Sequence, residues 1–295
     1  MTDRIIEIAD TAAFLSFENH LLKIRIPDGR ITTVPVAEIQ CLILANPAVT
    51  VTGALLAELA AAGVMVVVSG SNRMPVAMHL PLEGNYVQNE RFREQIGASL
   101  PLQKRLWQCV VREKIRTQGQ LLKDLHGDDY HLLHMSAKVS SGDKENLEGR
   151  AAALYWKHLF PEPFLRDRDA KDNNVLLNYG YAILRAATAR AIIGSGMLCV
   201  SGIHHCNQYN AFALADDVME PYRPFIDEVV FGERDFFKTE DLTREHKAKL
   251  LQLLAMDVKI RNDRRPLANA LSYTTASLAR CFQKEEKEIA YPEFV

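Results

Sequence analysis

Three short segments in the second half of the chain carry side chains that can bind a hard divalent cation. They contain one carboxylate, a pair of adjacent histidines and an acidic run, in this order: Glu148; His204 and His205; Asp216, Asp217 and Glu220. Carboxylates with one imidazole suit Mg²⁺ or Mn²⁺ better than zinc, which prefers thiolate and imidazole. Such ions commonly serve phosphoryl transfer, because they activate the attacking oxygen and stabilise charge on the phosphate. The donor types therefore favour a metal centre for phosphoryl transfer.

Each segment taken alone also has an ordinary structural interpretation. Glu148 fits a solvated carboxylate in a Glu- and Arg-rich helix. Gly149, placed near the middle of that helix, costs about 1 kcal/mol relative to alanine, which weakly indicates a close approach of another helix or a substrate. Either histidine fits a hydrogen-bonded structural side chain. Adjacent histidines do not readily face the same way, so only one of the two is expected to be a ligand.

The acidic run fits either a metal site or a solvated helix end. On a helix, Asp217 and Glu220 are three residues apart and share a face. Like charges placed so repel each other unless a positive group neutralises them, and a divalent cation would do so. Pro221 is expected to end the helix at Glu220. Spacing alone does not choose between the two histidines or among the three acids.

Composition bounds the class of protein. The 295 residues, 48% hydrophobic and 24% charged, are typical of a globular protein with one large domain or two ordinary ones. The five cysteines are odd in number and scattered, which argues against a disulfide framework or a structural zinc site. The sequence shows neither a secretory signal nor an apolar stretch long enough to span a bilayer, so we expect a cytoplasmic protein without a membrane partner.

The net charge neither indicates nor excludes a nucleic-acid partner. It is −2, from 35 basic and 37 acidic residues, so what matters is whether the basic side chains share a face. Candidates for phosphate contacts are Arg150, Arg166, Arg168, Lys171, Arg185, Arg190 and Arg223, followed by Lys259, Arg261, Arg264 and Arg265.

Secondary-structure patterning divides the chain in two. Short β-prone runs are expected at Ile5–Ile8, Ala13–Phe17, Leu21–Ile26, Ile31–Pro35, Cys41–Ala45, Val64–Val68 and Val76–Leu80. One helix, with Thr52 as N-cap, is expected from Gly53 to Ala62. After a hinge at 81–85, helical patterning is expected at Val87–Leu125, Asp143–Phe160, Asn173–Ile193, Phe212–Met219, Thr243–Ala255 and Pro266–Glu286. The predicted fold class is α+β: a small β-rich N-terminal domain (1–84) followed by a large all-α catalytic domain (85–295).

The motifs, taken in order, resemble a known family. They are Asn146–Ala152, Asp172-Asn173 with Leu177–Arg185, Gly202–Gln208 and Leu214–Pro224. This ordered set is similar to the CRISPR-associated adaptation integrase and endonuclease, the first Cas protein, in the version found in type II systems. The resemblance covers essentially the whole chain, and the ordered set is far more specific than any one motif.

The resemblance implies a site and a reaction. By motif position the metal ligands are Glu148, His205 and Glu220, holding Mg²⁺ or Mn²⁺, with Asp217 as a supporting acid. The implied reaction inserts captured double-stranded DNA as a new spacer into a CRISPR array, by attack of a 3′-hydroxyl on a repeat phosphodiester. Water in place of the hydroxyl gives endonuclease activity from the same centre.

The resemblance also implies partners. The family forms homodimers, for which the β-rich domain is the expected scaffold, and two dimers flank a dimer of a small ferredoxin-like subunit, the second Cas protein. The bound DNA is the double-stranded protospacer and the CRISPR repeat. The type II likeness adds the effector nuclease that reads the PAM. Two alternatives remain at this point: a stand-alone metal-dependent nuclease on branched or double-stranded DNA, and a DNA-binding scaffold without catalysis.

Overall fold

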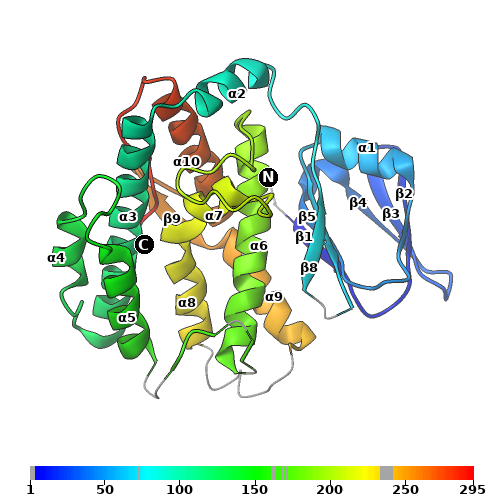
Figure 1. The fold of residues 1–295 in the computed structure, drawn as a ribbon. Helices are drawn as coiled ribbons and strands as arrows, with labels where there is room; N and C mark the ends of the chain where they lie inside the picture. The colour runs from blue at the N-terminus through cyan, green and yellow to red at the C-terminus, as the bar shows by residue number, and fades with distance from the viewer. Residues whose placement is uncertain (1–3, 72–73, 161–163, 168, 171, 233–241) are drawn as a thin grey trace. The chain divides into compact units, whose positions relative to one another are not determined.

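The computed structural model describes residues 4–71, 74–160, 164–167, 169–170, 172–232 and 242–295. The chain divides into two compact units, Met1–Tyr86 and Val87–Val295. The first unit is β-rich and the second is mostly helical, which confirms the α+β class (Figure 1).

The N-terminal unit contains two four-stranded sheets. In the first, β1, β5 and β7 are parallel and β8 pairs antiparallel with β7. In the second, β4, β3 and β2 form an antiparallel meander, and β6 pairs parallel with β2. The strands are β1 (Arg4–Ile8), β2 (Phe14–Glu18), β3 (Leu21–Arg25), β4 (Ile31–Pro35), β5 (Ile39–Leu44), β6 (Thr50–Val51), β7 (Met65–Ser69) and β8 (Pro75–His79).

The sequence patterns explain this unit well. Every residue of β5 is buried, as the apolar run that begins at Cys41 predicts, and the buried strand also includes Ile39 and the polar Gln40. Thr52 caps helix α1 (Gly53–Ala61) by accepting a hydrogen bond from the backbone N–H of Leu55, and a short 3₁₀ turn, η1 (Val36–Glu38), precedes β5. Side chains from both sheets and from α1 share one core. The seven predicted strands and the helix are confirmed, and the two-residue β6 is the addition.

The C-terminal unit is built mainly from helices. Its helices are α2 (Gln88–Ile96), α3 (Leu100–His126), α4 (Leu132–Ala137), α5 (Leu147–Leu159), α6 (Asn173–Gly194), α7 (Ala213–Met219), α8 (Arg223–Gly232), α9 (Arg244–Gln252) and α10 (Leu267–Phe282), with 3₁₀ turns η2 (Glu220–Tyr222) and η3 (Leu253–Ala255). Within the described part of the chain, no helix is both long and apolar enough to cross a membrane.

Two expectations for this half were wrong, and two helices were missed. It is not all-α, because β9 (Asp257–Ile260) and β10 (Asp263–Pro266) form an antiparallel hairpin. The helical stretch 87–125 is two helices, because residues 97–99 interrupt it before Pro101 enters the first turn of α3. Helices α4 and α8 were not predicted.

A buried segment, α7–η2–α8, lies at the centre of the helical unit. It packs against α3 on one side and α6 on the other, while α5 packs against α3 and α10 against α6 (Figure 1). Pro221 ends the α-helix as expected, but the chain continues through η2 directly into α8. Every residue of α7 and η2 is buried, although three of them are acids. The fold must therefore supply partners for these carboxylates.

Helix α6 approaches α8 most closely at Gly180. A Cβ at this position would lie 2.5 Å from Cγ2 of Ile226, so we expect Gly180→Ala to lower the free energy of unfolding by about 1–3 kcal/mol through overpacking. Gly194→Ala in the same helix, where a Cβ would meet nothing within 4 Å, should be neutral or slightly stabilising. Denaturant unfolding of both variants measures the difference, and equal effects would contradict the close helix packing.

Candidate metal centre

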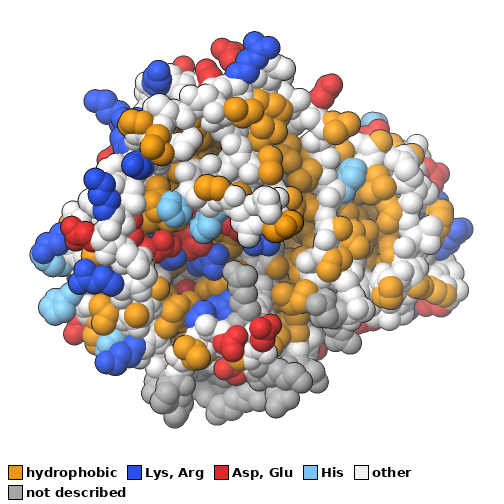
Figure 2. Space-filling model, viewed as in Figure 1, with side chains coloured by type: hydrophobic (Ala, Val, Ile, Leu, Met, Phe, Trp, Pro, Cys, Tyr) orange, Lys and Arg blue, Asp and Glu red, His pale blue; other side chains and the backbone are white. Residues whose placement is uncertain are grey.

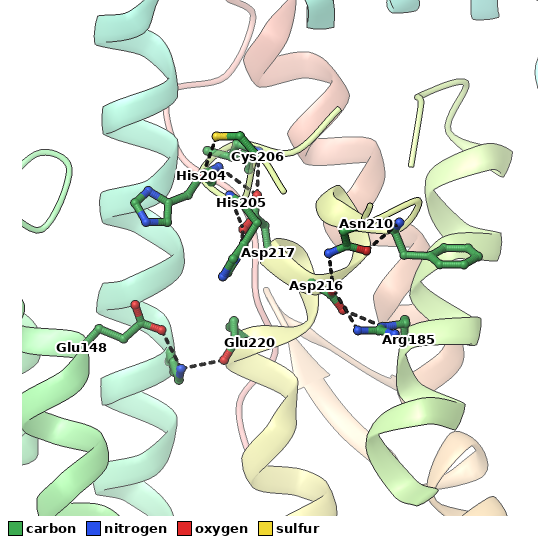
Figure 3. Close-up of polar contacts among 12 residues, drawn as sticks. Glu148, Arg185, His204, His205, Cys206, Asn210, Asp216, Asp217 and Glu220 are labelled. Carbon is green, nitrogen blue, oxygen red and sulfur yellow. Dashed lines mark hydrogen bonds and ion pairs between the residues drawn. The ribbon is translucent and has the colours of Figure 1, made fainter. Parts of the chain in front are cut away.

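Two of the predicted ligands meet on one ammonium group. Glu148 lies in the first turn of α5 and Glu220 begins η2. In Figure 3 dashed lines lead from both carboxylates to one nitrogen, which is Nζ of Lys114 in α3. Lys114 Nζ lies 2.7 Å from Glu148 Oε1 and 2.6 Å from Glu220 Oε2. Carboxylates separated by 72 positions in the sequence thus share a single cation.

Glu220 is held as a buried, ionised carboxylate. Its side chain is 7% exposed, and its second oxygen pairs with Arg223 Nη2 at 2.8 Å. Burial alone would raise the pKa of Glu220, but Arg223 and Lys114 outweigh it, so the pKa is lowered. The carboxylate can therefore bind a cation without first losing a proton.

The N-terminus of α5 fixes the backbone of Glu148. Asn146, at a φ of 51°, is the N-cap and accepts from the backbone N–H of Gly149 at 3.2 Å. Asp143 accepts from the backbone N–H groups of Leu147 at 2.9 Å and Glu148 at 3.0 Å. The helix thus begins four residues after the predicted start at Asp143. Asp143 lies outside the helix and binds its first backbone N–H groups.

Gly149 also has a different neighbour from the one expected. It is the third residue of α5, and a Cβ there would lie 2.9 Å from the Asn146 side chain. The close neighbour is the helix's own cap and not another helix.

The two histidines of the α6–α7 loop face different ways, as expected. The His204 ring stacks on Trp107 of α3, with centroids 4.2 Å apart and planes 7° apart. The His205 ring lies at 82° to it and contacts Trp107 only by an edge. His205 lines the cavity beside Glu220, whereas His204 points away from it (Figure 3). The geometry therefore favours His205 as the ligand.

Asp217 holds the His205 loop in place. Its carboxylate is fully buried and accepts from the backbone N–H groups of Ile203 at 2.6 Å and His204 at 2.9 Å, and from His205 Nδ1. This hydrogen bond raises the pKa of His205 against the opposing effect of burial. With Nδ1 engaged, Nε2 is the ring nitrogen left for a ligand.

The loop requires glycine at position 202. A Cβ on Gly202 would lie 2.5 Å from the His205 carbonyl oxygen and 2.9 Å from Asp217 Oδ2. A side chain would therefore push the backbone away from the carboxylate that anchors it.

Asp216, the remaining acid of the run, has its own partners. Arg185 of α6 donates to Asp216 through Nε at 2.6 Å and Nη2 at 2.9 Å, and Asn210 Nδ2 donates to it at 2.7 Å. The expected repulsion between Asp217 and Glu220 is thus relieved by separate neutralising groups, since backbone amides and His205 serve Asp217 while Lys114 and Arg223 serve Glu220.

A cavity of about 540 Å³ lies beside Lys114, His205, Asp216 and Glu220. Its charged lining includes Lys114, Arg166, Arg185, His205, Glu220 and Arg223. Figure 2 shows basic and acidic side chains gathered in a hollow on this face of the helical unit. Three of the expected phosphate-binding arginines are therefore brought together, whereas Arg168 and Lys171 lie outside the described residues. Arg261 and Arg265 instead form ion pairs with Glu286 and Asp263.

The donor set fits a hard divalent ion by its chemistry. Two carboxylates already share one cation, and an imidazole with a fixed ring orientation stands beside them. As the side chains stand, no group of three or more His, Cys, Asp or Glu among the described residues is arranged to hold a metal directly. The Lys114 ammonium lies where the carboxylates converge. The predicted ligand set thus stays a prediction that requires Lys114 to move.

Sequence reasoning missed a buried carboxylate beside the cavity. Asp227 of α8 accepts from the hydroxyls of Tyr155 at 2.7 Å and Tyr181 at 2.5 Å, which ties α8 to α5 and α6. Burial raises the pKa of Asp227 to about 6, against the lowering effect of both hydrogen bonds. The sequence carries only an Asp-Glu pair in an apolar helix, which does not show that one acid points inward.

Comparison with known proteins places these features in a family. The model of the family described as CRISPR associated protein Cas1 matches residues 6–258. The CRISPR-associated endonuclease Cas1 of Neisseria meningitidis serogroup C is 34% identical, over 95% of this chain and 93% of its own.

Solved structures share the fold. A casposase bound to integration product has a TM-score of 0.77 at 17% identity, covering 97% of this chain and 92% of its own. A chain of a Cas6-RT-Cas1–Cas2 complex has a TM-score of 0.74 at 20% identity, covering 97% of this chain and 35% of its own.

The Asp217 anchor leads to a first prediction for this site. Asp217→Asn keeps the side-chain shape but replaces one acceptor oxygen by an N–H donor. We expect the free energy of unfolding to fall by about 2–3 kcal/mol, because a buried backbone N–H loses its acceptor. Hydrogen exchange at residues 203–205 should become faster. Asp216→Asn is the control, because its contacts are to side chains, and equal acceleration there would refute the anchor.

Asp227 leads to a second prediction, on pH dependence. An acid whose pKa is raised by folding adds stability that is complete below its unfolded pKa and is lost as pH rises through the folded value. The stability of the wild-type protein relative to Asp227→Asn should therefore fall by about 3 kcal/mol between pH 4 and pH 7. Denaturant unfolding at several pH values measures it, with the exposed Asp263→Asn as control. A difference independent of pH would contradict the raised pKa.

Proposed function

The chain belongs to the family of CRISPR associated protein Cas1, and from this premise we propose that it is a metal-dependent DNA integrase and endonuclease acting in spacer acquisition. In this proposal a 3′-hydroxyl of captured double-stranded DNA attacks a phosphodiester of the CRISPR repeat. A new P–O bond forms, the repeat strand is broken, and its 3′-oxygen leaves with a proton. Water in place of the attacking hydroxyl gives hydrolysis.

One observation carries the proposal: Glu148 and Glu220 share one cation at a cavity lined by His205 and arginines. Carboxylates that share a cation are suited to hold a divalent ion, and the arginines suit a phosphodiester. The name of the Neisseria relative supports cutting. The casposase with its integration product supports joining by a protein of the same fold.

The mechanism assigns separate tasks to the residues of this chain. Bound by Glu148, His205 and Glu220, Mg²⁺ or Mn²⁺ would supply Lewis acidity that favours ionisation of the attacking hydroxyl and stabilises charge on the phosphate. Asp217 keeps the His205 ring oriented, and Asp143 and Asn146 fix the backbone of Glu148. Arg185, Arg166 and Arg223 face the same cavity and orient the anionic phosphate.

The proposed partners follow the family. We propose a homodimer that assembles with a dimer of the small ferredoxin-like second Cas protein, two dimers to one. A structure with this fold comes from a complex named as containing Cas1 and Cas2, which supports that assembly. The DNA partners are the double-stranded protospacer and the repeat, contacted mainly through their backbones. Cooperation with a type II effector nuclease rests on the resemblance of the motifs to the type II version, and we also propose a cytoplasmic location.

The ligand assignment predicts a separation of DNA binding from joining. Purified His205→Ala should fold and bind DNA as the wild-type protein does, but lose joining activity by about a hundredfold or more in Mg²⁺ or Mn²⁺ with the partner subunit present. Gel shift and strand-joining assays measure the two properties.

His204→Phe is the matched control, because it keeps a ring on Trp107 and lies outside the cavity. It should join at a rate within a few-fold of the wild-type rate. Full integration by His205→Ala would refute the assignment of His205 as a metal ligand. DNA binding without divalent-dependent cutting or joining by the wild-type protein would instead favour a scaffold.

A further inference from the structure

We propose that Lys114 is an internal counter-cation that competes with the divalent ion for Glu148 and Glu220, and so sets how tightly the centre binds metal. The inference rests on the proposed metal centre. The inference adds to that centre the idea that metal binding exchanges one cation for another.

The position of the ammonium carries the proposal. Lys114 Nζ contacts one oxygen of each predicted carboxylate ligand, at 2.7 Å and 2.6 Å, and its side chain is only 13% exposed. A divalent ion bound by the same oxygens would lie within a few ångströms of the ammonium. Two cations at that separation repel strongly where little water screens them. Metal entry and the present lysine position therefore exclude each other.

The Lys114 ammonium also stabilises the fold around the two carboxylates. Removing one partner of a buried ion pair leaves an uncompensated charge, which is strongly destabilising. Arg223 pairs with one oxygen of Glu220. Lys114 pairs with the other oxygen of Glu220 and also with Glu148. Lys114 thus stabilises the metal-free protein by the same contacts that oppose the metal.

The cavity beside Lys114 has room for the ammonium group when a metal displaces it. Lys114 lines the 540 Å³ cavity, together with Gln118 one turn further along α3. A lysine has a flexible four-carbon stem, so its ammonium can leave the carboxylates while its backbone stays in the helix. Released into the cavity, the positive charge would face the space that receives the phosphodiester.

Calorimetric titration of the full-length protein with Mn²⁺, in the absence of DNA, tests the competition. Lys114→Met should bind Mn²⁺ about tenfold more tightly or better, because no internal cation has to be displaced. The metal-free variant should also unfold at lower denaturant concentration than the wild-type protein.

Arg185→Met is the matched control. It removes one positive charge from the same cavity, but its partner Asp216 is not a predicted ligand. Its Mn²⁺ affinity should change by less than about threefold, the effect of a more distant charge. Equal affinities of Lys114→Met and the wild-type protein would overturn the competition and leave the metal centre standing. Failure of both to bind Mn²⁺ would overturn the metal centre itself.

A second measurement uses the wild-type protein and does not depend on a variant that folds. Reductive methylation of lysines, followed by mass spectrometry, should modify Lys114 slowly in the metal-free protein and faster in saturating Mg²⁺. The exposed Lys138 should react at the same rate in both states. An unchanged Lys114 rate, with metal binding shown by calorimetry, would overturn the exchange.

Discussion

The helical unit is organised by the burial of three acids on one short segment. Asp216, Asp217 and Glu220 lie within five residues of α7 and η2, every residue of which is buried. A buried carboxylate is tolerated only when charged or hydrogen-bonding partners satisfy it. The partners come from different elements: Arg185 from α6 for Asp216, loop amides and His205 for Asp217, and Lys114 of α3 with Arg223 of α8 for Glu220. The need to satisfy three charges thus fixes how these elements meet.

Lys114 and Arg223 balance the charges of Glu148 and Glu220 within the protein itself. Lys114 joins Glu148 to Glu220, so the carboxylates are held near each other without an external cation. In the proposed centre, the apparent affinity for metal would reflect the difference between the binding free energies of the metal and of the ammonium at the same oxygens, and not the intrinsic strength of the ligands. It follows that a weak apparent affinity would not argue against a metal-dependent reaction. Phosphate binding nearby would favour the displaced ammonium and so assist metal entry.

Local sequence patterns predicted most of the secondary-structure elements. They did not predict the side-chain partners, which depend on tertiary contacts. The strands of the first unit and helix α6 followed from apolar runs, caps and glycines. Lys114 could not be singled out, because Arg112-Glu113-Lys114 has the composition of a solvated helix face, and only the packing of α5 and η2 shows where the ammonium lies. The acids were expected to share a cation on one face, but the 3₁₀ turn at Pro221 and the close His205 loop gave each its own partner. The choice of ligands came from the ordered motifs and stays a prediction.

A fourth buried carboxylate, Asp227, lies beside the same cavity and links the helices around it. Asp227 binds the hydroxyls of Tyr155 and Tyr181, so α5, which carries Glu148, is tied directly to α8, which follows Glu220. Because the pKa of Asp227 is about 6, this clamp carries a charge at neutral pH and loses it in mild acid. Arg223 interacts electrostatically with both Asp227 and Glu220. Protonation of Asp227 would therefore remove one of the negative charges that interact with Arg223. The charge of this clamp thus changes near pH 6, at a residue that lies beside the predicted ligands but is not one of them.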